Sequence, residues 1–152
     1  MKASLLLTKD QQTQLRAAIQ KAERYTSGEI RIHIETDLKG DLFDRAAWIF
    51  RKIGMEKTAE RNGVLFYLAV EPRKFAIIGD KGINAKVPED FWNRIRIVLE
   101  NYFREGKFAE GLCEGVIMAG LQLREHFPNR KNDIDELPDE ISFDDPDKTG
   151  TL

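Results

Sequence analysis

The sequence predicts an α/β domain in which a mixed β-sheet is sandwiched between helices, a three-layer α/β/α arrangement. Two strand patterns carry this prediction. Isoleucines alternate with polar residues over 29–36, as in a strand with one dry face and one wetter face. By contrast, residues 64–70 are "VLFYLAV", an almost unbroken apolar run typical of a central strand that is buried on both faces. Four further segments have apolar residues at helical spacing.

The first helix is predicted from Thr8 to about Tyr25. Thr8 and Gln11 have the spacing of a capping box, in which the threonine oxygen accepts a hydrogen bond from a first-turn amide and the glutamine reaches back to the cap. Ser27 and Gly28 end this helix, and the alternating strand follows. Because one face of that strand is polar, we expect it to lie near an edge of the sheet.

Connection lengths predict how the first three strands pair. The 26 residues from Asp37 to Asn62 leave room for a helix over about 42–53, and hence for parallel pairing of the first two strands. Only the turn "EPRK" separates the second strand from the third, "FAIIGD", and so short a turn favours an antiparallel hairpin. The sheet is therefore predicted to be mixed.

Two more helices are predicted after the third strand. The first is expected to begin at Pro88, because a first-turn proline loses no hydrogen bond and Glu89 and Asp90 would face the positive end of the helix dipole. The second is expected over 108–127, where small residues four positions apart form a smooth ridge that allows close packing on the sheet.

The chain is predicted to divide into a domain over residues 1–127 and an acidic C-terminal tail over residues 128–152. The tail has eight acids against three bases and few apolar residues. Its apolar side chains could dock an extended segment on the domain, whereas its last ten residues are expected to be mobile. The apolar residues in question are Ile134, Leu137, Ile141 and Phe143.

Composition argues against several classes of function. One cysteine and two histidines cannot build a disulfide framework or a Cys/His metal cluster, so a metal would need oxygen ligands. Bases are dispersed among acids, which argues against nucleic-acid binding. The N-terminal apolar run is shorter than a secretory signal, and no run approaches the roughly 20 apolar residues that insert in a membrane. We therefore expect a cytoplasmic protein, and no nucleotide fingerprint points to an organic cofactor.

Several short motifs occur in the order that is typical of the TPM domain family, and the chain resembles that family over about Leu15 to Leu123. The family is named for a thylakoid-lumen protein, a photosystem II repair factor and a modulator of an acetylcholine receptor. The motifs are "NGVL" at Asn62 to Leu65, "GxxG" at Gly79 to Gly82, Trp92, and "FxxGxFxxGLxxG" from Phe103 to Gly115.

This resemblance implies a mixed sheet with helices on both faces. It also implies one of three roles that are linked to family members: acid phosphatase activity, calcium binding, or an accessory role in a larger assembly. Many members carry a signal peptide and a membrane segment or a glycine-rich tail. Since neither is seen in this sequence, the resemblance points to a shorter, soluble bacterial-type branch of the family.

The predicted topology brings a set of polar residues to one end of the sheet, the edge at which the first and second strands begin and the third strand ends. In a hairpin of the second and third strands, Asp80 lies beside Arg61 and Asn62, and parallel pairing of the first two strands brings Glu29 to the same edge. Together with Asn84, these residues form the candidate site.

Asp80 and Asn62 are the candidate metal ligands at this edge. Hard cations such as Ca²⁺ or Mg²⁺ take carboxylate and amide oxygens, but about six ligands are needed. Asp and Asn also bond readily to nearby backbone amides, so a role in holding turns is the alternative, and we favour it. Asp37 and Asp41 follow the first strand and fall at the opposite edge, where they form an alternative metal site.

Nucleophilic catalysis is disfavoured by the pattern of residues. Cys113 lies in an apolar helical stretch, and no serine has an evident histidine partner. His33 is interpreted as a packed or solvated histidine and not as a base, with Arg31 and Glu35 on the same face of the strand as its partners. A phosphate cradle at "GDKG" is also disfavoured, because Asp80 and the acids that follow would repel an anion.

Two functional hypotheses follow. The first is a non-catalytic accessory module that docks on another protein and binds a divalent cation. The alternative is a metal-dependent acid phosphatase, in which Asp80 and Arg61 are the catalytic pair and Asn62, Asn84 and Glu29 assist binding. The sequence does not determine the oligomeric state.

Overall fold

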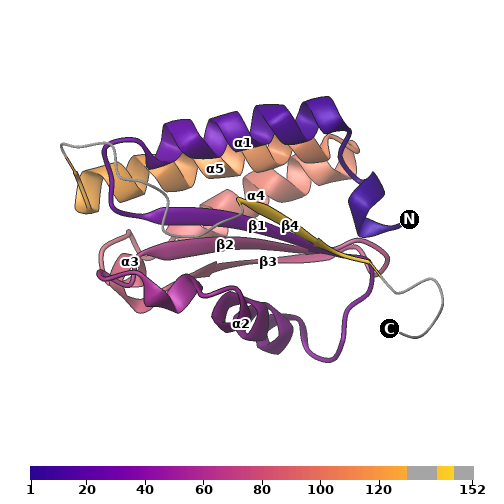
Figure 1. The fold of residues 1–152 in the computed structure, drawn as a ribbon, viewed down its shortest axis with the longest axis horizontal. Helices are drawn as coiled ribbons and strands as arrows, with labels where there is room; N and C mark the ends of the chain where they lie inside the picture. Colours follow the sequence, from indigo (N-terminus) through magenta and orange to yellow (C-terminus); the bar gives the residue numbers. More distant parts are fainter. Residues whose placement is uncertain (130–139, 146–152) are drawn as a thin grey trace.

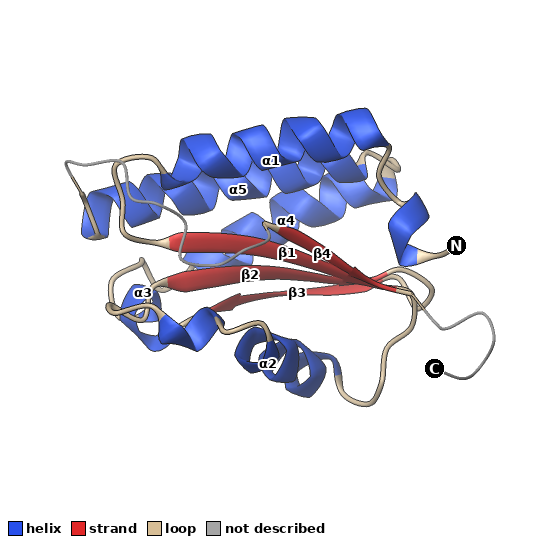
Figure 2. Ribbon diagram, viewed as in Figure 1, coloured by secondary structure: helices blue, strands red, loops and turns tan. Residues whose placement is uncertain are grey.

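The computed structural model describes residues 1–129 and 140–145 (Figures 1 and 2). Its helices are α1 (Lys9–Glu23), α2 (Leu42–Lys52), α3 (Lys81–Asn84), α4 (Phe91–Arg104) and α5 (Phe108–His126), with short 3₁₀ turns η1 (Ala3–Leu5) and η2 (Met55–Lys57). Its strands are β1 (Glu29–Glu35), β2 (Gly63–Ala69), β3 (Lys74–Gly79) and β4 (Ile141–Asp144).

The four strands form one mixed sheet in the order β3-β2-β1-β4. β1 is parallel to β2, with Glu29 opposite Gly63, and β2 forms an antiparallel hairpin with β3. These findings confirm the predicted mixed sheet and the predicted pairing of its first three strands. The α/β fold with helices packed on the sheet is likewise confirmed.

As predicted, β1 lies near an edge of the sheet, but it is not the edge strand, and the prediction of one wetter face was wrong. β4, which comes from the C-terminal tail, pairs in parallel with β1 from Ile32–Ile141 to Glu35–Asp144, so β1 is an inner strand. All seven residues of β1 are buried. The polar face of the strand therefore reflects a buried polar network and not contact with water.

Helices cover both faces of the sheet (Figure 1). α1, α4 and α5 lie on one face, where Ile30, Ile32 and Phe66 belong to the larger apolar core. α2 lies on the other face, where its Ile49 and Phe50 belong to a smaller core. The two faces of β1 therefore differ. Its isoleucines face the large core, and the alternating residues Arg31, His33 and Glu35 point to the opposite face.

The helix starts agree with local sequence signals except at Pro88. The capping box of α1 is present, because Thr8 Oγ1 accepts from Gln11 N and Gln11 Oε1 accepts from Thr8 N. The helix predicted to begin at Pro88 begins at Phe91, and Phe91 N donates to the Pro88 carbonyl in a preceding turn. That prediction was wrong by three residues because the acids after Pro88 belong to the turn.

The tail contributes a strand to the sheet. Ile141 in β4 is 4% exposed and belongs to the large core, as expected for a docked segment. Beyond β4, Asp145 accepts hydrogen bonds from Ser4 and Thr36 and so joins the N-terminus to the end of β1. Ile134 and Leu137, which were predicted to dock, and the last residues, which were predicted to be mobile, lie outside the described residues.

Candidate functional site

Asp80 and Arg61 meet at the edge where β2 begins and β3 ends. Arg61 Nε lies 2.7 Å from Asp80 Oδ2, and Arg61 Nη2 lies 2.9 Å from Asp80 Oδ1. Oδ1 also accepts from Lys81 N at 2.7 Å, which makes Asp80 the N-cap of α3. Asp80 is 7% exposed and the Arg61 side chain 36%, so both carboxylate oxygens are engaged in a partly buried, bidentate ion pair.

The other residues predicted at this edge have separate partners. Asn62 is fully buried, and its Nδ2 donates to Ser27 Oγ at 2.9 Å. Asn84 Nδ2 donates to the Gly79 carbonyl, and its Oδ1 accepts from Trp92 Nε1. Glu29 Oε2 lies 3.2 Å from Arg31 Nη2. The structure therefore pairs Asp80 with Arg61 but joins neither Asn84 nor Glu29 to that pair.

The arrangement around Asp80 does not fit a calcium or magnesium ion. Its carboxylate receives a guanidinium and a backbone amide, so a cation would have to displace Arg61 and would then find few further ligands. Among the described residues, no three His, Cys, Asp or Glu side chains converge at this edge. The geometry instead supports the alternative role of Asp80 in holding the turn.

The glycines of "GDKG" serve close packing. A Cβ atom on Gly82 would lie 2.1 Å from the Glu60 carbonyl oxygen and 2.6 Å from that of Arg61. A Cβ atom on Gly79 would lie 2.4 Å from the Trp92 ring. Gly82 N donates to the Arg61 carbonyl at 2.8 Å, so it is not available to a phosphate.

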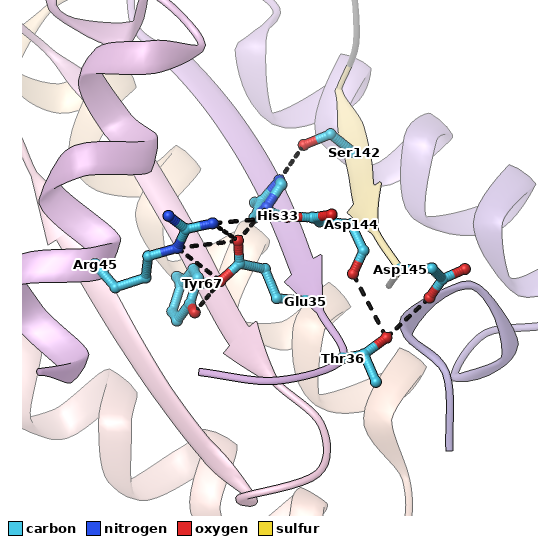
Figure 3. A network of polar contacts seen from close by, with 8 residues as sticks. All are labelled: His33, Glu35, Thr36, Arg45, Tyr67, Ser142, Asp144 and Asp145. Carbon is cyan, nitrogen blue, oxygen red and sulfur yellow. Dashed lines mark hydrogen bonds and ion pairs between the residues drawn. The ribbon is translucent and has the colours of Figure 1, made fainter. Parts of the chain in front are cut away.

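A second polar group lies at the opposite edge, where β1 and β4 end (Figure 3). Glu35 is 3% exposed and binds Arg45 of α2, whose Nε lies 3.1 and 3.0 Å from the two carboxylate oxygens. Arg45 Nη2 lies 2.5 Å from Glu35 Oε1, and Tyr67 of β2 donates its hydroxyl to Oε2. Side chains from two other elements thus converge on one buried carboxylate of β1.

His33 and Asp144 complete this group, which we call the carboxyl-edge network. His33 Nδ1 lies 2.7 Å from Ser142 Oγ of β4, and its Nε2 lies 3.4 Å from Glu35 Oε1. Arg45 Nη2 also reaches Asp144 Oδ2 at 3.6 Å. The predicted contact of His33 with Glu35 is confirmed, whereas Arg31 pairs with Glu23 and Glu29.

The sequence interpretation missed four residues of this network: Arg45, Tyr67, Ser142 and Asp144. No serine was expected to partner a histidine, and this was wrong, because β4 brings Ser142 beside His33 across 109 positions of sequence. Ile141, Ser142 and Phe143 alternate between apolar and polar as the residues of β1 do, which could have indicated a strand here but not its partner.

Electrostatics fix the protonation of Glu35 and Tyr67 at neutral pH. Burial favours the neutral acid of Glu35, but the surrounding side chains of His33, Arg45 and Tyr67 outweigh it and hold the pKa of Glu35 well below its usual range. Burial, followed by the hydrogen bond to Glu35, raises the pKa of Tyr67 well above its usual range. Neither group is poised for proton transfer near neutral pH.

Asp37 and Asp41, the alternative metal ligands, lie beyond β1 at this same edge. Both are exposed, and Asp41 Oδ2 accepts from Phe43 N and Asp44 N, each at 3.1 Å, as the N-cap of α2. Within the part of the chain that the structure describes, neither joins a group of three potential ligands.

A pocket of about 770 Å³ lies between the β2–β3 turn and the corner between α4 and α5. Aromatic rings line it: Phe103 packs 5.1 Å from Phe75 and 5.2 Å from Phe108 between ring centroids. Charged side chains also line it, namely Glu71, Arg73, Lys74, Glu100 and Arg104. Its volume is in the range of known ligand pockets.

The family follows from comparison with known proteins. The model of the TPM domain matches residues 2–120. The chain belongs to the TPM domain family. No curated protein matches this TPM domain.

Across residues 1–129 and 140–145, no helix has the length and apolar character needed to span a bilayer.

Solved structures agree with this assignment. The BA42 protein from the psychrophilic bacterium Bizionia argentinensis is 46% identical, with a TM-score of 0.83 over 90% of this TPM domain chain and 94% of BA42. The N-terminal domain of a P. gingivalis protein is 23% identical, with a TM-score of 0.67 over 84% of each chain. The N-terminal domain of the cg2496 protein from Corynebacterium glutamicum is 14% identical, with a TM-score of 0.61 over 77% of this chain and 74% of that one. The last two share the fold.

Proposed function

We propose that this TPM domain is a non-catalytic binding module that holds a segment of a partner protein in the pocket between the β2–β3 turn and the α4–α5 corner. The observation that carries the proposal is the aromatic lining of that pocket. Rigid aromatic walls bury large apolar area at small entropic cost, and concave apolar sites of this size are the usual places for ligands.

Charge complementarity favours an acidic partner segment. The pocket is lined by the cations Arg73, Lys74 and Arg104 and by the amino-terminal residue Met1. Its two acids already have partners: Glu71 binds the Met1 amine, and Glu100 binds Arg96 and lies 3.9 Å from Arg104, so Arg73 and Lys74 are the main cations at the rim. A surplus of positive charge at the rim attracts a segment in which an apolar anchor is flanked by Asp or Glu.

Fluorescence polarisation with short labelled peptides tests this function. A peptide with a phenylalanine or leucine anchor flanked by aspartates is expected to bind, and the same anchor flanked by lysines is expected to bind at least about tenfold more weakly. The double substitution Arg73→Glu with Lys74→Glu should weaken the acidic peptide by about tenfold or more. The matched control, Lys21→Glu with Lys86→Glu, removes two exposed cations elsewhere and should leave the affinity unchanged.

Two results would count against the binding module. One is equal binding of the acidic and the basic peptide, because the rim charges would then have no role. The other is equal loss of affinity in the charge-reversed pair and its control, which would indicate general electrostatic attraction and not a site.

The metal-dependent phosphatase is the weaker candidate, because the ion pair with Arg61 and the cap of α3 occupy the Asp80 carboxylate. We expect no hydrolysis of a generic phosphomonoester above background with Ca²⁺ or Mg²⁺. Hydrolysis that is abolished by both Asp80→Asn and Arg61→Ala would favour the phosphatase instead.

A further inference from the structure

Three potential metal ligands converge in the carboxyl-edge network. His33, Glu35 and Asp144 each offer one ligand atom, and these atoms all lie within 4.8 Å of one another. They come from neighbouring positions in the sheet, because Glu35 pairs with Asp144 across β1 and β4, and His33 is two residues before Glu35 on the same face. Among the described residues, this is the group that offers three such ligands.

The histidine supplies an independent indication of a ligand. His33 is 6% exposed, and its Nε2 is buried and makes no hydrogen bond, although Glu35 Oε1 lies 3.4 Å away. Its other nitrogen, Nδ1, is held by Ser142 Oγ at 2.7 Å. A metal-binding histidine in proteins is oriented in this way, with one nitrogen bonded to a polar partner and the other directed at the ion.

Arg45 shows that the two carboxylates favour a cation between them. Its Nη2 lies 2.5 Å from Glu35 and 3.6 Å from Asp144 (Figure 3). Its guanidinium also lies over the ring of Trp48, 4.5 Å from the centroid, and that ring is 42% exposed. The Trp48 ring therefore offers Arg45 a nearby place on the surface if another cation displaces it from the carboxylates.

We propose that His33, Glu35 and Asp144 form a site for a divalent transition metal such as Zn²⁺, and that Arg45 takes the place of the metal when none is bound. An imidazole nitrogen with two carboxylates suits Zn²⁺, Co²⁺ or Mn²⁺ better than Ca²⁺, which prefers an all-oxygen shell. Three protein ligands leave a coordination position for water or for a group from a partner. This site is separate from the pocket of the proposed function.

Isothermal titration with Zn²⁺, and visible absorption with Co²⁺, test the site in the full chain. The wild type is expected to bind one ion, with Ca²⁺ at least about tenfold weaker. Arg45→Met should tighten Zn²⁺ binding, because it removes the competing cation and the repulsion. Ser142→Ala should weaken binding by about tenfold or more, since it releases the histidine ring. His33→Gln should abolish binding at this site.

Two variants control for other ligands. His126→Gln removes the second histidine, which lies on α5, and Cys113→Ser removes the thiol. Neither should change Zn²⁺ affinity. If either abolishes binding while His33→Gln retains it, the proposal is overturned.

NMR of the wild-type chain keeps the proposal testable if a variant fails to fold. Substoichiometric Mn²⁺ should broaden the amide signals of His33, Glu35 and Ser142 first, because a paramagnetic ion relaxes nearby nuclei most. Broadening centred on another region, or no binding of Zn²⁺ by either wild type or Arg45→Met, would overturn the proposal.

Discussion

At the scale of single residues, close packing against neighbouring backbone explains the "GDKG" motif, which resembles a ligand-binding loop. Gly82 lies against the backbone of Glu60 and Arg61, and the neighbouring Asp80 caps α3 and binds Arg61. From the sequence, the two glycines and an Asp-Lys pair fit either a phosphate loop or a joint. The structure joins β3 to α3 here, so the loop residues satisfy each other and not a ligand.

Gly82→Ala is expected to destabilise the fold by about 1–3 kcal/mol, because a Cβ atom 2.1 Å from a backbone oxygen forces the backbone to shift. Urea denaturation measures the change in the free energy of unfolding. The control is Gly40→Asn: Gly40 has a φ of +80° with nothing within 4 Å of its Cβ position, and Asn tolerates that conformation. Equal effects from the two substitutions would show that packing at Gly82 is unimportant.

At the scale of elements, β4 decides the character of β1. Without β4, the polar residues of β1 would face solvent at an edge, which is the arrangement that alternation alone predicts. With β4 in place, β1 is an inner strand, and Ser142 and Asp144 reach His33 and Arg45. The acidic composition of the tail hid this strand, because only Ile141 and Phe143 carry the apolar signal.

Ile141→Ala should lower the free energy of unfolding by about 2–4 kcal/mol, as for other fully buried aliphatic truncations. Thermal and urea unfolding give this value. Leu121→Ala is the matched control, since Leu121 is 55% exposed on α5, and it should change stability by no more than about 0.5 kcal/mol. A similarly small effect for Ile141→Ala would mean that β4 contributes little to the fold.

At the scale of the whole molecule, the carboxyl-edge network ties the α2 layer to three strands of the sheet and makes stability depend on pH. It links α2 through Arg45, the inner strands through Glu35 and Tyr67, and β4 through Asp144. Folding lowers the pKa of Glu35, so the folded state binds fewer protons than the unfolded chain. The stabilisation is therefore present above the unfolded pKa of about 4.3 and is lost as the pH falls toward the folded value.

Glu35→Gln is expected to cost about 3–5 kcal/mol at pH 7, because it leaves Arg45 without its main counter-charge in a buried setting. The variant should also lose less stability than the wild type between about pH 5 and pH 3. Urea unfolding at several pH values measures both effects. Glu100→Gln, which breaks a more exposed pair with Arg96, is the control and should cost no more than about 1 kcal/mol. Parallel pH profiles for Glu35→Gln and the wild type would contradict the assigned role of Glu35.

The sequence by itself determined the four longer helices, the first three strands, their pairing and the family, because these follow from periodicity, capping and connection length, all of which are local. It did not predict α3, and it placed the start of α4 three residues too early. It also placed Asp80 beside Arg61, since a hairpin fixes that register. Only the tertiary structure decided that β1 is an inner strand, and that His33, Glu35 and Arg45 meet Ser142 and Asp144. A parallel pairing between residues more than 100 positions apart depends on how the sheet and its helix layers pack, and no local pattern encodes it.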